Sequence, residues 1–276
     1  MKFDLRLLQI LFLGSFLLFG ILVLNWDTNL TNVLSIIAVT LLTQSLFCLA
    51  FNLPINTVKS SLITALGLSI LLRSNYPFIF GLAGFFAIGS KYIFRIGGKH
   101  FINPANFGVV FIMLFTGSAW ISPGQWGNST ILFFVVGSLG LMILTNLSKI
   151  DLVLSFVFFY FGMDFCWNIL YKGWPLDYFY QNLTNGSILL FSFFMITDPS
   201  STPNSRSARI IWTFLVAALA FYLSAFCFVK GAPLYSLFLL SVLVPLLDKW
   251  SKASAFSWDS MKSRELYTND IPLHTD

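Results

Sequence analysis

Residues 60–72 read SSLITALGLSILL, an apolar stretch that opens with two serines. A second stretch of the same kind, GSILLFSFFMIT, occupies residues 186–197. Stretches of 12 and 13 residues reach about 18–20 Å as helices, whereas the hydrocarbon core of a bilayer is about 30 Å thick. Polar turns follow both, RSNYP at 73–77 and TDPSSTP at 197–203. These stretches therefore predict helices that enter a membrane without crossing it.

The whole composition is that of an integral membrane protein. Apolar residues make up 57% of 276 positions and charged residues 10%, whereas soluble domains carry about 25% charged residues. The run LLQILFLGSFLLFGILVLNW, residues 7–26, is apolar on every side, which favours helices over the alternating strands of a barrel. No small-residue cleavage site follows this run, so we interpret it as a first helix and not as a signal peptide.

The basic residues indicate how the chain crosses the membrane. If the amino terminus is cytoplasmic, 13 of the 16 basic residues lie on the cytoplasmic side, and only Arg73, Lys172 and Lys230 lie outside. This distribution follows the positive-inside rule and places both termini in the cytoplasm. We therefore relate the net charge of +5 to topology and expect no nucleic-acid partner. The expected segments are 7–26, 30–53, 60–72, 76–93, 105–120, 129–147, 151–171, 186–197, 208–229 and 233–247.

Ten segments divide into two sets of five, and each short stretch is the third of its set. Because five is odd, the second set enters the membrane from the opposite face. We therefore predict an all-α membrane protein with two inverted five-helix repeats, at residues 1–120 and 121–248, followed by a cytoplasmic tail at 249–276. In such folds the short, interrupted helices mark a binding site near the midplane. In the alternative, both stretches are merely short or tilted spans of a bundle.

A polar cluster, RIGGKHFINPANFG at 95–108, follows the fourth segment. Its two adjacent glycines permit a tight turn, and Asn103-Pro104 presets the start of the next helix. Lys99, Arg95 and the backbone amides at that helix start could hold an anion such as phosphate. Alternatively, the basic residues only follow the positive-inside rule.

The second set carries a matching cluster, FFMITDPSSTPNSRSAR at 193–209. Asp198-Pro199 ends the short helix, and several hydroxyl groups lie close in sequence to Arg206 and Arg209. This cluster could line a site, or it could be a helix stop followed by cytoplasmic arginines.

Two further features leave two interpretations open. Asp164 lies inside an apolar run, where an ionisable group is a functional candidate, although Asn168 one turn away could satisfy it. The uncharged loop TGSAWISPGQWGNST, residues 116–130, contains Trp120 and Trp126. These rings fit an interfacial aromatic belt or a lid over a planar ligand.

The sequence contains no catalytic motif that we recognise. No Ser-His-Asp set, paired carboxylates, phosphate loop or cluster of metal ligands is present. The three cysteines lie singly in separate apolar segments, without the spacing of zinc or iron-sulfur sites. Hydrolytic and zinc chemistry are therefore not expected.

Three stretches together resemble a known family. They are SSLITALGLSILLRSN at 60–75, GSKYIFRIGGKHFINPANFG at 89–108 and NGSILLFSFFMITDPSSTPNSRSAR at 185–209. They resemble the short helix, the Gly-Lys-Asn-Pro-Ala turn and the Thr-Asp-Pro turn of the RnfD/NqrB family. Its members are membrane-embedded flavin subunits of the Rnf complex and of the sodium-pumping NADH:quinone reductase. The resemblance covers residues 55–250 and implies a ten-helix inverted-repeat fold, also found in urea transporters.

The resemblance also implies electron transfer across the bacterial inner membrane through flavins. Family members that attach FMN covalently use a threonine within an alanine-threonine motif after the fifth helix. The corresponding loop here has no alanine-threonine pair, and the setting of its nearest hydroxyl, Thr130, does not match. Classical subunits also carry a longer amino-terminal extension, which we do not expect here. We therefore expect a compact, stand-alone relative that holds FMN or riboflavin without a covalent bond.

A flavin suits the residues at the two short stretches. Its flat apolar ring fits a slot lined by aromatic side chains, and its polar chain needs hydroxyl, amide and backbone groups. The residues expected to line one or both flavin sites are Ser60, Ser61, Thr64, Lys99, Asn103, Asn106, Thr197 and Asp198.

Three functions agree with the sequence. The first is a redox subunit that relays electrons through bound flavin. The second is a channel or carrier for a small polar solute, which could itself be a flavin. The third is a structural subunit of a larger complex. Each function has the lipid bilayer and other membrane subunits as partners.

Overall fold

The computed structural model describes residues 5–52, 57–122, 140, 149–183, 185–251 and 253. Its α-helices are α1 Leu5–Leu22, α2 Leu30–Phe51, α3 Val58–Leu71, α4 Pro77–Ile93, α5 Pro104–Thr116, α7 Ile150–Asp164, α8 Leu176–Leu183, α9 Gly186–Leu190, α10 Arg206–Ala225, α11 Ala232–Leu240 and α12 Leu243–Ser251. Two π-helical segments, η2 Phe165–Tyr171 and η3 Phe191–Met195, continue α7 and α9. The strands are β1 Leu72–Ser74, β2 Arg95–Ile96, β3 Lys99–His100 and β4 Ala119–Ile121.

Within these described ranges, three helices are long and apolar enough to cross a membrane: α2, α7 with η2, and α10. The pair α11 and α12 qualifies as a fourth span that is bent by 51°. Large apolar side chains on α2 face outward, among them Leu42, Leu46 and Leu49, as expected of a surface in contact with lipid. The protein is therefore an integral membrane protein, while the count of ten spans stays a prediction.

Several predicted features fall on residues that the structure does not describe. They are segment 129–147 apart from Gly140, together with Trp126, Thr130 and the tail from 254 onward. The predicted boundary at 248 lies inside α12, which continues to Ser251.

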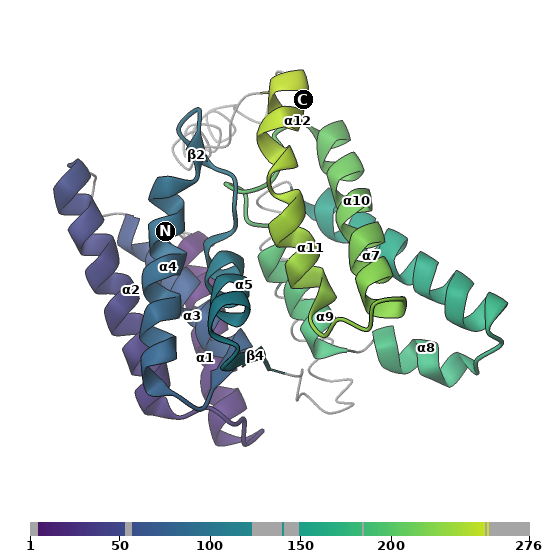
Figure 1. Ribbon diagram of the computed structural model, residues 1–276, viewed down its shortest axis with the longest axis horizontal. Helices are drawn as coiled ribbons and strands as arrows, with labels where there is room; N and C mark the ends of the chain where they lie inside the picture. Colours follow the sequence, from purple (N-terminus) through teal and green to yellow (C-terminus); the bar gives the residue numbers. More distant parts are fainter. Residues whose placement is uncertain are drawn as a thin grey trace, which may run out of the picture.

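The two halves of the chain lie side by side. In Figure 1 the purple and blue helices α1 to α5 form one side, and the green and yellow helices α7 to α12 form the other. In the first half α4 packs against α2 and α5, and in the second half α10 packs against α7 and α11. The halves meet where α5 packs against α11. The shared packing order agrees with a repeat, and the inversion stays a prediction.

Both short stretches form short helical segments, as predicted. The first is α3, and the second is α9 with η3, which together end at Met195. The chain leaves α3 through β1, which pairs antiparallel with β4. Arg73 in β1 donates hydrogen bonds to the carbonyls of Ser69 and Leu72, at 3.0 and 2.8 Å. These bonds satisfy carbonyl groups that the end of a helix leaves unpaired.

The predicted helix 105–120 is too long, because α5 ends at Thr116. Gly117 follows with φ of +58°, a left-handed conformation that ends helices. Residues Ala119–Ile121 then form β4. The tight turn predicted between α4 and α5 is confirmed. Gly97 and Gly98, with φ of +60° and +79°, form the turn between β2 and β3.

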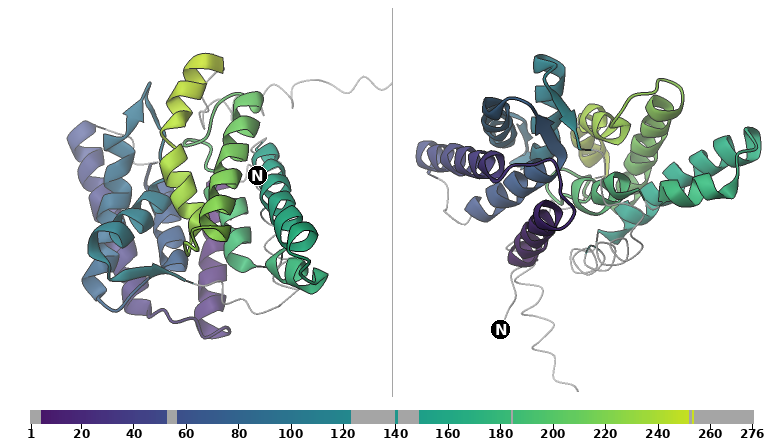
Figure 2. Two further views of the ribbon diagram at one scale, coloured as in Figure 1. Left: turned by 45° about the vertical axis from the view of Figure 1, so that its right-hand side comes forward. Right: turned by 90° about the horizontal axis from the view of Figure 1, so that it is seen from below.

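A limb made of α7, η2 and α8 projects from the second half (Figures 1 and 2). Asp164 at the end of α7 is buried and accepts hydrogen bonds from Asn168 and Asn182, at 2.9 and 3.1 Å. The predicted pairing with Asn168 is therefore confirmed. Asn182 belongs to α8, a helix that the sequence analysis does not anticipate. Asp164 thus joins α8 to the end of the long span.

Candidate functional site

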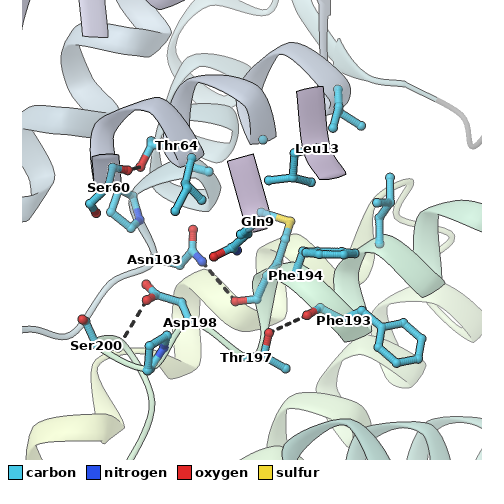
Figure 3. Close-up of a pocket in the computed structure, with 18 of the residues that line it drawn as sticks. Gln9, Leu13, Ser60, Thr64, Asn103, Phe193, Phe194, Thr197, Asp198 and Ser200 are labelled. Carbon is cyan, nitrogen blue, oxygen red and sulfur yellow. Dashed lines mark hydrogen bonds between the residues drawn. The ribbon is translucent and has the colours of Figure 1, made fainter. Parts of the chain in front are cut away.

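Two cavities lie back to back between the halves. The first, which we call the Asp198 cavity, has a volume of about 110 Å³ and lies among α1, α3, η3 and the start of α5 (Figure 3). The second, the Trp120 cavity, has a volume of about 890 Å³ and is lined by parts of β4, α7, α9 and α11. Leu71 and Met195 line both cavities and so form the wall between them.

The short helices run in opposite directions between these cavities. α3 lines the Asp198 cavity from Ser60 onward and reaches the wall at Leu71. The segment α9 and η3 starts beside the Trp120 cavity at Ser187, lines the Asp198 cavity from Leu190 onward and contributes Met195 to the wall. Entry of the two short helices from opposite membrane faces stays a prediction.

Asn103 joins the start of α5 to the end of η3. Its side-chain oxygen accepts a hydrogen bond from the backbone N–H of Asn106 at 3.0 Å and so caps α5, which starts at Pro104 as predicted. Its side-chain nitrogen donates to the carbonyl of Met195 at 3.0 Å. Asn106 in turn donates to the carbonyl of Leu234 in α11 at 3.1 Å. Side-chain amides therefore connect three elements beside the wall.

Asp198 lies in the turn after η3, at the edge of its cavity. Its carboxylate is 3.7 Å from the Nε2 atom of His100 and accepts a hydrogen bond from the N–H of Ser200 at 3.2 Å. Burial by itself raises the pKa of Asp198, but the hydrogen bond and charge of His100 and the bonds of Ser200 and Ser201 lower it overall. The group is therefore a carboxylate at neutral pH.

Five of the eight predicted site residues line the Asp198 cavity: Ser60, Thr64, Asn103, Thr197 and Asp198. The hydroxyl groups of Thr64 and Thr197 donate to carbonyls one turn back in their own helices, at 3.0 and 2.6 Å. Ser60 accepts a hydrogen bond from the ammonium of Lys91 at 3.2 Å.

The other three predicted residues line neither cavity. Ser61 is fully buried, and its hydroxyl donates to the carbonyl of Val58 at 2.7 Å. Asn106 is also fully buried, against α11. Lys99 lies behind the Asp198 cavity, where its ammonium contacts the Thr202 carbonyl at 2.5 Å, the Asn204 side-chain oxygen at 2.9 Å and the Asp248 carboxylate at 2.8 Å.

The Lys99 contacts form a brace between the hairpin and the second half. Asp248 belongs to α12, and its other oxygen accepts from the N–H of Asn204 at 2.7 Å. Arg209 extends the cluster by pairing with Asp151 at 2.6 Å. The three donors of the Lys99 ammonium are engaged in this way. Its role in the structure is to hold elements together. Arg95 is exposed and donates to the Gly98 carbonyl at 2.7 Å.

Several residues of both cavities are not predicted from the sequence. In the Asp198 cavity they are Arg6, Gln9, Lys91 and His100. In the Trp120 cavity they include Tyr160, Asn182, Asn185, Ser187 and Lys230. Gln9 interrupts an apolar run, which is a usable signal, whereas Arg6 and Lys91 cannot be told apart from charges that only set topology.

The volumes of the two cavities indicate which of them suits a flavin. Sites for small molecules usually measure about 300–1,000 Å³. The Trp120 cavity, at about 890 Å³, lies in that range, and the Asp198 cavity, at about 110 Å³, lies below it. Trp120, Tyr160 and Phe191 supply aromatic surface in the larger cavity, and Asn182 and Asn185 supply amides. These residues fit a flat ring system with polar edges.

The described part of the chain contains no group of three or more His, Cys, Asp or Glu side chains that could hold a metal ion. Cys48 is buried, Cys166 and Cys227 are exposed, and all three are unpaired.

Comparisons with known proteins agree with the resemblance seen in the sequence. The chain is 35% identical over 75 residues to the RnfD protein of the ion-translocating oxidoreductase complex of Stutzerimonas stutzeri, covering 27% of this chain and 21% of that protein. It is 32% identical over 74 residues to the corresponding protein of Tolumonas auensis, covering 27% and 21%. For the corresponding protein of Buchnera aphidicola the values are 26% over 113 residues, covering 35% and 32%.

The matched segments thus span between a fifth and a third of the length of these curated relatives. The model of the NQR2, RnfD, RnfE family matches residues 113–257, just over half of the chain. That match includes the α9–η3 half-helix, the Asp198 turn and most of the Trp120 cavity. The chain belongs to the NQR2, RnfD, RnfE family.

Proposed function

We propose that this protein is a membrane subunit of an electron-transport complex and that it passes electrons between the two membrane faces through non-covalently held flavin. The names of the relatives, subunits of an ion-translocating oxidoreductase complex, support this proposal. We place the protein in the bacterial inner membrane with both termini in the cytoplasm, as the distribution of basic residues indicates. Other subunits of such a complex would supply and remove the electrons.

The arrangement of the two cavities is the observation that carries the proposal. They lie in series, and a wall that includes Leu71 and Met195 separates them. Both wall side chains are buried, with exposed fractions of 6% and 5%. Electrons can tunnel across one layer of side chains, whereas a solute or ion is stopped by an apolar constriction. The wall therefore suits electron transfer with little leakage of ions.

The Trp120 cavity is the place where the chain's residues best fit a flavin. When bound, a flavin supplies reversible one- and two-electron chemistry. Trp120, Tyr160 and Phe191 offer flat surface to a ring system, and the amides of Asn182 and Asn185 can donate to or accept from its polar edge. Burial between apolar walls lowers the local dielectric, so these few polar contacts would set the redox potential.

A matched pair of variants in α5 tests the proposal. Met113 lines the Trp120 cavity, while Leu114 beside it is 58% exposed on the outer surface of α5. The full chain, purified from membranes, should show the visible absorption bands of flavin, bleached by dithionite, and acid precipitation should release the pigment. Met113→Trp should lose most of this pigment because the ring fills the cavity, and Leu114→Trp should keep it. A colourless wild-type protein would contradict the proposal.

A channel or carrier for a small polar solute is the second candidate, because the cavities lie on either side of a wall that could open. Uptake of riboflavin into liposomes that contain the protein would favour it, if Leu71→Ala accelerated the uptake. Uptake equal to that of protein-free liposomes, together with a bound flavin that is reduced and reoxidised, would favour the electron relay.

A further inference from the structure

Basic side chains gather at the Asp198 cavity. Arg6 and Lys91 line it together with His100. Its described lining residues include one carboxylate, Asp198, which is engaged by His100 and by the N–H of Ser200.

Lys91 is the most deeply buried of these cations, with an exposed fraction of 8%. Its ammonium donates to the hydroxyl of Ser60 at 3.2 Å. Among the described residues no carboxylate oxygen lies within the 4.0 Å that defines an ion pair with this ammonium. Asp198 attracts this ammonium from a greater distance, but a buried ammonium without a direct ion pair is costly. An anion in the adjoining cavity would remove this cost.

The start of α5 adds a second source of positive potential. Asn103, Pro104 and Ala105, the cap and the first two residues of this helix of 13 residues, line the same cavity. Pro104 has no N–H, so Ala105 carries the first backbone donor of the helix. Helix starts carry a partial positive charge and bind anions, phosphate groups in particular. The helix start and Lys91 come from different elements and face one space.

The size of the cavity limits the ligand. A volume of about 110 Å³ lies below the about 300–1,000 Å³ of usual sites for small molecules. The space therefore suits a compact group such as phosphate. Gln9, Ser60 and Thr64 also line it and add hydrogen-bonding groups (Figure 3).

We propose that the Asp198 cavity binds a phosphate group, held by the charges of Lys91 and Arg6 and by the start of α5. The group could come from inorganic phosphate or from the headgroup of an anionic phospholipid, because the chemistry of recognition is the same. This site is separate from the Trp120 cavity. It does not require a flavin, so a colourless protein that binds phosphate would overturn the electron relay and leave this inference intact.

The test is the unfolding temperature of the full chain in nanodiscs, since a ligand that binds only the folded state raises it in a saturable way. One arm titrates inorganic phosphate into phosphatidylcholine nanodiscs, with sodium chloride at equal ionic strength as the reference. The other arm replaces part of the lipid with phosphatidylglycerol. A rise in the first arm identifies free phosphate, and a rise in the second alone identifies the lipid headgroup.

Three variants complete the test. Lys91→Met keeps the length of the side chain and should weaken phosphate binding by about tenfold or more, while Lys91→Arg should retain most of it. Arg95→Gln removes the same charge from an exposed site outside the cavity and should behave like the wild type. The inference is wrong if neither phosphate nor phosphatidylglycerol stabilises the wild type beyond chloride. It is equally wrong if Lys91→Met responds as the wild type does.

Discussion

The two cavities have opposite characters although they share a wall. The Asp198 cavity is small, and cationic groups and a helix start surround it. Behind it the Lys99 brace joins β3 to α12, and the Arg209–Asp151 pair joins α10 to α7. The Trp120 cavity is eight times larger by volume, at about 890 against 110 Å³, and aromatic and amide groups line it. The Asp198 cavity thus suits a charged ligand, and the Trp120 cavity suits a planar, mostly apolar ligand.

This difference shows how one membrane fold can keep two environments apart. Charged groups in a medium of low dielectric must be paired, and the brace provides partners for them. The Trp120 cavity needs no such brace, since Lys230 is the only cation among its described lining residues. Disrupting ionic contacts should therefore affect the Asp198 side strongly and the Trp120 side weakly.

The largest effect is expected from cutting the brace. The side chain of Asp248 is only 17% exposed, and Lys99→Met leaves its carboxylate without a cation. Removing one partner of a buried pair costs about 3–5 kcal/mol, so the unfolding temperature of the purified chain should fall by several degrees. The double variant Lys99→Met, Asp248→Leu should recover part of this loss. Equal unfolding temperatures for Lys99→Met and the exposed control Arg95→Met would show that the brace contributes nothing.

The brace also shows what the sequence can and cannot predict. The sequence favours an anion-binding role for Lys99 because this residue follows two glycines and precedes a helix start. Its partners lie more than a hundred residues away, at Thr202, Asn204 and Asp248. A local pattern contains no information on such contacts. The turn itself and the start of α5 are predicted correctly, since both depend on residues adjacent in sequence.

The ionisation of Lys149 should make the free energy of unfolding depend on pH. It precedes α7, and burial first, then repulsion from Arg209 and Lys99, lowers its pKa from 10.5 to about 8. Between about pH 8 and 10.5 the unfolded chain therefore binds more protons than the folded chain. The free energy of unfolding rises with pH through this window. At 1.36 kcal/mol for each pKa unit, the rise is at most about 3.4 kcal/mol.

Lys149→Met should abolish this pH dependence and should raise the unfolding free energy at neutral pH, although it removes a 3.3 Å hydrogen bond to Thr202. Lys172→Met, on the opposite end of the long span, is the control. Unfolding temperatures recorded from about pH 7 to 10.5 measure both effects. An unchanged slope in Lys149→Met would assign the pH dependence to other groups.

The smallest effect compares the two helix caps. Asn103 caps α5 and also donates to the Met195 carbonyl, whereas Asn185 caps α9 through the N–H of Ser187 at 3.0 Å. Loss of a cap costs about 1 kcal/mol, and a buried carbonyl without its donor costs about 1–3 kcal/mol more. Asn103→Ala should therefore destabilise the chain by more than Asn185→Ala does, as measured by thermal unfolding. Equal losses would mean that the Met195 contact adds nothing.

The pattern of success in the sequence analysis follows from the same physics. The short helices can be predicted because the length of an apolar run is a local property. Of the five predicted site residues that cluster, all but Thr64 lie at or near the ends of helical segments. The Trp120 cavity cannot be predicted, since β4, α7, α9 and α11 each contribute a few residues to it. The helix α8 is missed because its apolar and polar residues are mixed within two turns.

The strand pair β1 and β4 has a consequence for the wall. Leu71 accepts a backbone hydrogen bond from the N–H of Ser122 at 2.7 Å, directly after the register that pairs Leu72 with Ile121. The main chain, and not the shape of one side chain, thus determines where the partition stands. Replacing the Leu71 side chain would change how well the wall separates the two cavities, while the distance between the cavities would stay constant.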